Sequence, residues 1–223
     1  MNEIIIDSKN KLIVTTDNAG SIGEKVNDTI QVSYDVVSYF TLRNAIIDNL
    51  AQNTKLLSFT FANFNGNDAY NKIIKGINRV FDEIGYKIPY TSSTESNYIM
   101  KESAFSVTVI GEKQQYINTR YKKYAVVGKP LIGIEIINQK DDIVTLKEFE
   151  YLLNHKDISL IIPVGSKGIN HRTKMLLDKK FVSDKIDLNK SAGPSTCILI
   201  EYKKLNDIDK EIIKKVTALE LLR

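Results

Sequence analysis

The residues from Leu12 to Lys25, LIVTTDNAGSIGEK, combine side chains that can bind a magnesium-chelated polyphosphate. Asp17 follows a run of β-branched residues, and α/β folds place their ligands at the carboxyl ends of strands. Gly20 and Gly23 leave backbone N–H groups uncovered, and Lys25 adds a mobile positive charge. The segment is neither a Walker A loop nor a Gly-x-Gly-x-x-Gly motif. A plain turn of Gly, Asn and Ser is the alternative interpretation.

A second carboxylate, Asp48, follows Asn44 by four residues in a stretch whose apolar spacing predicts a helix. Residues at this spacing share one helix face. Asp48 is therefore a candidate to join Asp17 on a metal ion, and an exposed surface acid is the alternative.

Two further loops are candidate binding sites. PYTSSTESNY, from Pro89 to Tyr98, carries hydroxyl and amide side chains together with Glu95, which is a candidate Mg²⁺ ligand. IIPVGSKGINHRTK places Ser166 and Lys167 between a predicted strand and a predicted helix, where free N–H groups bind anions. A solvated turn and an N-capping serine are the respective alternatives.

Strand and helix patterns alternate along the chain, which predicts an α/β or α+β protein. We expect two subdomains that divide near residue 115, one of residues 1–115 and one of residues 116–223, each a mixed sheet with helices packed on it. The predicted strands are within residues 2–7, 11–17, 56–64, 103–111, 124–128, 131–137, 158–165 and 195–204. The predicted helices are within residues 36–51, 68–84, 146–155, 169–180 and 207–222, the second ending at Gly85.

Composition narrows the class of protein. The single cysteine, Cys197, excludes an internal disulfide, and two histidines with no Cys/His cluster argue against a zinc site. The absence of long apolar runs and the polar start predict a cytoplasmic protein that does not contact membranes. Residues 113–223 carry 21 Lys and Arg against 14 Asp and Glu. Since these lysines lie beside acids on predicted helices, we expect a solvated face and no nucleic-acid partner.

The order of the motifs resembles the N-terminal half of the aminoimidazole ribonucleotide synthetase superfamily over residues 10–112. That superfamily also includes selenophosphate synthetase, thiamine monophosphate kinase and a hydrogenase maturation factor. VTTDNAGSIGEK, YFTLRNAII, TSSTESN and FSVTVIGE are most similar to a small subgroup of cobalamin salvage, the α-ribazole kinases. The resemblance implies an ATP-dependent kinase that phosphorylates a riboside, with ATP and Mg²⁺ bound at a homodimer interface.

The resemblance also implies roles for individual residues. Those implied to have catalytic roles are Asp17, Lys25 and Glu95; the implied metal ligands are Asp17, Asp48 and Glu95; the implied ATP contacts are Asn18, Gly20, Gly23, Lys25 and Asp48; and the implied substrate contacts are Thr94, Asn97, Ser166 and Lys167. The chain departs from the superfamily motifs at Ile47, where an Asn is expected, and at Ser92 and Ser93, where paired glycines are expected. Another ATP-using member, similar to thiamine monophosphate kinase or a synthetase, and an inactive nucleotide-binding regulator are the alternatives.

Overall fold

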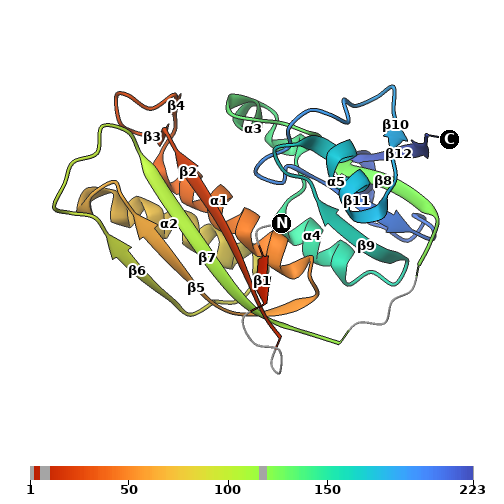
Figure 1. Cartoon of the computed structure of the whole chain (residues 1–223), viewed down its shortest axis with the longest axis horizontal. Helices are drawn as coiled ribbons and strands as arrows, with labels where there is room; N and C mark the ends of the chain where they lie inside the picture. The colour runs from red at the N-terminus through yellow and green to blue at the C-terminus, as the bar shows by residue number, and fades with distance from the viewer. Residues whose placement is uncertain (1–2, 6–10, 116–119, 223) are drawn as a thin grey trace. The chain divides into compact units, whose positions relative to one another are not determined.

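The computed structural model describes residues 3–5, 11–115 and 120–222 of the chain. It forms two compact units, Met1–Tyr116 and Ile117–Arg223 (Figure 1). Within the described residues, no helix has the length and apolar character needed to cross a lipid bilayer.

The first unit is built on a five-stranded sheet in the order β1-β2-β7-β5-β6. Neighbouring strands are antiparallel except for the parallel pair β5 and β6. A short parallel bridge joins β3 (Ile22–Gly23) to β4 (Ile30–Gln31). The sheet strands are β1 (Glu3–Ile5), β2 (Leu12–Gly20), β5 (Thr54–Asn63), β6 (Tyr90–Thr94) and β7 (Ala104–Lys113).

Two helices, α1 (Tyr34–Leu50) and α2 (Tyr70–Ile84), lie on one face of this sheet (Figure 1). A 3₁₀ turn, Asn67–Ala69, precedes α2, and Gly85 ends it in the left-handed conformation with φ 78°, as predicted. Helix α1 packs against β2, β7 and α2, so it is buried on several sides. This helix carries Asn44 and Asp48 into contact with the sheet.

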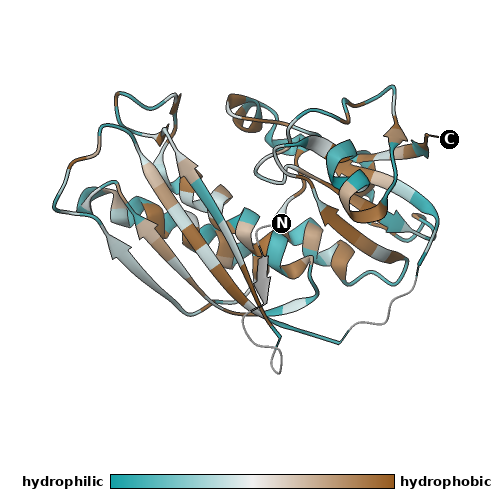
Figure 2. Ribbon diagram, in the orientation of Figure 1, coloured by the Kyte–Doolittle hydropathy of each residue, from teal (hydrophilic) through white to brown (hydrophobic). Residues whose placement is uncertain are grey.

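Successive side chains along the strands of the first sheet alternate between a buried face and an open face. On β7, Phe105, Val107 and Val109 are buried beneath the helices, whereas Ser106 and Thr108 between them are half-buried on the other face. Figure 2 shows the same alternation of apolar and polar bands along the strands. Period-2 patterning of this kind covers one face of an antiparallel sheet and leaves the other uncovered.

The second unit has an antiparallel sheet in the order β10-β12-β8-β11-β9. Tyr124, Val126, Leu199 and Ile169 belong to a buried cluster that joins the sheet to α5, while α4 packs against β9. The elements are β8 (Lys123–Gly128), α3 (Ile134–Asn138), η2 (Lys140–Asp142), α4 (Leu146–Leu153), β9 (Ile158–Pro163), α5 (Gly168–Leu177), β10 (Phe181–Val182), β11 (Cys197–Tyr202), α6 (Lys210–Lys214) and β12 (Val216–Leu221).

The structure corrects two predictions in the first unit. Strand β2 does not end at Asp17, because Asn18, Ala19 and Gly20 continue its pairing with β7 as far as Ala104. The expected loop at 89–98 begins as a strand, since Tyr90–Thr94 pairs in parallel with β5. The strand predicted within residues 2–7 is described only at Glu3–Ile5, and residues 116–119 of the expected connector lie outside the described residues.

Two predictions in the second unit are also wrong. Residues 131–137 do not form a strand: Gly133 has φ 55°, and the short helix α3 follows it. A short apolar run does not distinguish a buried helix from a strand. The closing helix predicted at 207–222 is confirmed only for Lys210–Lys214. The residues after it, Val216–Leu221, form β12, which pairs with β8.

Candidate functional site

Asp17 lies on the helix-covered side of β2, opposite the polar face of α1. Hydrogen bonds fix α1 against β2: Thr15 Oγ1 donates to the Ala45 carbonyl at 2.7 Å, and Asn49 Nδ2 donates to the Ile13 carbonyl and to Thr15 Oγ1, each at 3.2 Å. With the helix held there, Asn44 donates a hydrogen bond to the Asp17 side chain, and Asp48 interacts electrostatically with it. The structure thus brings two predicted metal ligands together.

This environment changes the acidity of Asp17. Burial raises its pKa to about 7; hydrogen bonds from the Asn44 side chain and the Asn18 backbone oppose the rise, and the charge of Asp48 adds to it. A carboxyl group that is half protonated near neutral pH, beside a second carboxylate, is the arrangement expected where a cation can neutralise both.

Asn44 provides a further oxygen at this position. Its Oδ1 atom is buried and has no hydrogen-bond partner, although a buried acceptor without a partner costs about 1–3 kcal/mol. Carboxylate and amide oxygens are the ligands of hard divalent cations such as Mg²⁺. Asn44, Asp48 and Asp17 therefore fit such an ion. Sequence reasoning placed Asn44 on the face of Asp48 but did not make it a ligand.

Throughout residues 3–5, 11–115 and 120–222, no group of three or more His, Cys, Asp and Glu side chains is arranged to hold a metal ion. A cation at Asp17 would thus have two carboxylates and an amide as protein ligands. Mg²⁺ is commonly held in this way, by one or two carboxylates with the remaining positions taken by water and phosphate oxygens. The donor set fits a metal delivered with a polyphosphate.

Lys25 lies in the segment between β3 and β4. Its Nζ atom donates to the carbonyls of Glu102, at 3.2 Å, and Phe64, at 3.4 Å. Gly23 packs closely in the same segment, because an added Cβ would lie 2.4 Å from Ser103 Oγ. Gly20 ends strand β2, and Asn18 is exposed in register with Ser106. Their contacts with phosphate remain predictions.

The predicted residues after β6 form a turn of their own. Glu95 Oε1 accepts hydrogen bonds from the backbone N–H groups of Asn97, at 2.7 Å, and Tyr98, at 3.2 Å. Thr94 Oγ1 accepts from Asn63 Nδ2 at 3.4 Å. The third predicted metal ligand, Glu95, thus has partners different from those of Asp17.

In the second unit, the exposed residues Ser166 and Lys167 precede α5, as the sequence predicts. Their turn packs against a second turn: the Ala192 N–H donates to the Gly165 carbonyl at 3.2 Å, and an added Cβ at Gly168 would lie 2.7 Å from the Asn189 carbonyl oxygen. Burial raises the pKa of the Cys197 thiol, in agreement with an inert core residue.

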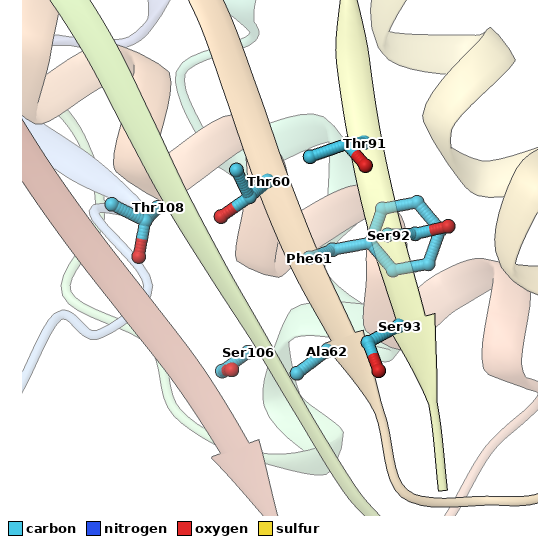
Figure 3. A pocket seen from close by; sticks show the side chains of 8 residues that line it. All are labelled: Thr60, Phe61, Ala62, Thr91, Ser92, Ser93, Ser106 and Thr108. Carbon is cyan, nitrogen blue, oxygen red and sulfur yellow. The ribbon is translucent and has the colours of Figure 1, made fainter.

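The open face of the first sheet carries an open depression of about 460 Å³ (Figure 3). Small and hydroxylated side chains from four neighbouring strands form two rows across it. Thr108 Oγ1 donates to Thr16 Oγ1 at 3.3 Å within the first row. The rows are Thr16, Thr108, Thr60 and Thr91, and Asn18, Ser106, Ala62 and Ser93.

No protein-family model and no curated protein matches the sequence, but solved structures match the fold. Thiamine monophosphate kinase from Aquifex aeolicus has a TM-score of 0.61 at 12% identity, covering 97% of this chain and 86% of the kinase. A HypE–HypF complex has a TM-score of 0.60 at 13% identity, covering 94% of this chain and 84% of the matched one.

Phosphoribosylformylglycinamidine synthase II from Thermotoga maritima matches all of this chain with a TM-score of 0.60 at 11% identity. The chain spans 37% of the length of that synthase. At these identities the likenesses show the fold alone. The chain has the mixed α+β fold of the aminoimidazole ribonucleotide synthetase type that these structures share.

Proposed function

We propose that the chain is an ATP-dependent small-molecule kinase that phosphorylates a riboside, converting α-ribazole to α-ribazole 5′-phosphate in cobalamin salvage. The oxygen cluster of Asp17, Asn44 and Asp48 carries this proposal, since it supplies ligands for a nucleotide-bound Mg²⁺. The motifs of residues 10–112 support the choice of riboside. A structural neighbour, the A. aeolicus kinase, has been solved in complex with AMPPCP and TMP. ATP and Mg²⁺ are abundant in the cytoplasm, where this activity belongs.

In this scheme Asp17, Asn44 and Asp48 would hold the Mg²⁺ that accompanies the nucleotide, and Lys25 neutralises phosphate charge. Mg²⁺, when bound, withdraws charge from the phosphate oxygens. The riboside 5′-hydroxyl oxygen attacks the γ-phosphorus and its proton is released to solvent, while the bond between the γ-phosphorus and the bridging oxygen breaks and ADP leaves. Glu95 orients the acceptor hydroxyl, with Thr94 and Asn97 beside it. Ser166 and Lys167, which precede α5, remain predicted acceptor contacts.

A kinase for a phosphorylated acceptor, comparable to thiamine monophosphate kinase, is the second candidate. The excess of 21 Lys and Arg over 14 Asp and Glu in residues 113–223 favours an anionic acceptor. A neutral riboside does not require this charge.

The decisive experiment measures ADP formation from ATP in the presence of Mg²⁺, with α-ribazole, with thiamine monophosphate and with no acceptor. Phosphorylated α-ribazole detected by mass spectrometry would establish the proposed reaction. Turnover with thiamine monophosphate alone would select the second candidate. Nucleotide binding without turnover of either acceptor would support a regulator and contradict both kinases.

Binding of Mg·ADP is expected to weaken as the pH falls below about 7. The metal needs the Asp17 carboxylate ionised, and burial raises the pKa of this group to about 7. Below that value the affinity falls about tenfold per pH unit, because one proton competes with the metal. Calorimetric titration at several pH values tests this. Asp17→Asn serves as the control for titration of the nucleotide itself, and an equal pH dependence in this variant would contradict the prediction.

The chain is expected to form a homodimer through the open face of the first sheet. Its rows of small side chains permit a second sheet to pack closely against it. Thr108→Arg, at the centre of the first row, should convert a dimer of twice 25.3 kDa into a monomer in light-scattering measurements. Asn78→Arg on the exposed side of α2 is the control. A wild-type protein that is monomeric at all concentrations would refute this interface.

A further inference from the structure

A buried carboxylate, Asp28, fixes the segment that carries Lys25. Asp28 is 7% exposed. Its Oδ1 atom accepts a hydrogen bond from the Ser103 N–H at 2.6 Å. Its Oδ2 atom accepts from Ser103 Oγ, at 2.6 Å, and from the N–H of Lys25, at 2.9 Å. Asp28 thus joins the segment between β3 and β4 to Ser103, the residue that precedes β7.

The surroundings of Ser103 strengthen this junction. The Ser21 N–H donates to the Ser103 carbonyl at 2.8 Å, and the hydroxyl groups of Tyr34 and Ser103 are 3.0 Å apart. Burial raises the pKa of Asp28, but the hydrogen bonds from Ser103 and Lys25 outweigh it and hold the pKa below its usual value. The group is therefore an anion that accepts three hydrogen bonds at neutral pH.

The junction restrains Lys25 at both ends. Asp28 accepts a hydrogen bond from the Lys25 backbone N–H. The Glu102 carbonyl, next to Ser103, accepts a hydrogen bond from the Lys25 ammonium group. A lysine side chain that is mobile before binding loses about 2 kcal/mol of rotamer entropy when a ligand orders it. Fixing its backbone and its resting contact in advance reduces that cost.

We propose that Asp28 is a positioning residue for nucleotide binding, which sets the place of Lys25 through its backbone N–H. This inference rests on the proposed function, in which Lys25 meets the phosphates. Asp28→Asn tests it directly, because an amide nitrogen in place of Oδ2 no longer accepts from the Lys25 N–H. Asn27→Ala is the matched control, since the neighbouring Asn27 is exposed.

The first measurement is amide hydrogen exchange in the nucleotide-free protein. Loss of the contact in Asp28→Asn should speed exchange at the Lys25 amide about tenfold, the factor expected for roughly 1.4 kcal/mol. Asn27→Ala should leave the exchange rate unchanged. Equal protection of this amide in Asp28→Asn and in the wild type would overturn the positioning role.

The second measurement is a double-mutant cycle on Mg·ADP affinity with Asp28→Asn, Lys25→Ala and both together. If Asp28 acts through Lys25, each single change weakens binding about tenfold and the double variant binds as Lys25→Ala does. Independent effects that multiply to about a hundredfold would overturn the inference and leave the proposed function intact. Failure of the wild type to bind Mg·ADP would instead overturn the proposed function, and with it this role of Asp28.

Ser103→Ala covers the case in which Asp28→Asn does not fold. This change removes one of the two Ser103 donors to Asp28 and leaves the Lys25 contact in place. A smaller loss of affinity, about threefold, is expected, and it should disappear in the Lys25→Ala background. A loss that persists in that background would overturn the inference.

Discussion

Asp17→Asn is expected to abolish phosphoryl transfer and, in the absence of metal, to stabilise the protein above pH 7. The first effect follows from the loss of a charged oxygen beside Asn44 and Asp48, where the proposed metal binds. Removing one such group from a phosphoryl-transfer site costs about a thousandfold in kcat. Initial rates of ADP formation with saturating Mg·ATP and acceptor measure it.

The stability effect follows from proton linkage. The folded-state pKa of Asp17, about 7, lies above the usual aspartate value of 3.8. Between these values the folded protein holds a proton that the unfolded chain has released. The resulting contribution to stability is therefore fully present below pH 3.8 and is lost as the pH rises through about 7. The loss is up to about 4 kcal/mol, since each pKa unit corresponds to about 1.4 kcal/mol.

Asn at position 17 does not ionise, so the stability of the Asp17→Asn variant does not decrease in this way as the pH rises. Urea unfolding without metal should show equal stability of the variant and the wild type near pH 4, and an advantage for Asp17→Asn that grows toward pH 8. Asp82→Asn, at an exposed position of α2, should change neither activity nor this pH dependence. A variant that retains wild-type kcat would refute the metal-binding role of Asp17. Such opposition between function and stability is common at binding sites.

The sequence predicted the fold class and those elements whose local signals agree with their tertiary setting. Helix α2 has an amphipathic pattern and ends at Gly85, and α4 begins with a capping box in which Thr145 and Glu148 bind each other's backbone N–H groups. Strand β12 could not be recognised in this way. Its sequence also fits a helix, and its pairing with β8, far away in the sequence, determines its conformation.

The candidate site, like the fold, could be predicted only in part from the sequence. The spacing of Asn44 and Asp48 indicated a shared helix face, but their proximity to Asp17 depends on how α1 docks on β2 through Thr15 and Asn49. Those contacts join residues 30 and 36 positions apart, and no local pattern in the sequence indicates them. The same holds for Asp28, whose partner Ser103 is 75 residues away.

The docking of α1 also depends on Gly76, and Gly76→Ala is expected to destabilise the first unit by about 2–4 kcal/mol. An added Cβ would lie 2.2 Å from the Asp35 carbonyl oxygen and 2.2 Å from Ser38 Oγ, both on α1. Alanine favours a helix over glycine by about 1 kcal/mol, which offsets only part of this overlap. Gly20→Ala is the control, because no atom lies within 4 Å of its added Cβ.

Urea unfolding at pH 7 measures the difference between the two variants, and equal stabilities would show that α2 can move away from α1 without cost. The expected result extends to the site, because α1 carries Asn44 and Asp48 while β2 carries Asp17. A shift of α1 separates the amide and the second carboxylate from Asp17. Folded Gly76→Ala should therefore bind Mg·ADP more weakly than the folded wild type, even though the atoms nearest the added Cβ belong to Asp35, Ser38 and Tyr39. Close approach of α1 and α2 is thereby expected to be a condition for the proposed metal binding at Asp17 on β2.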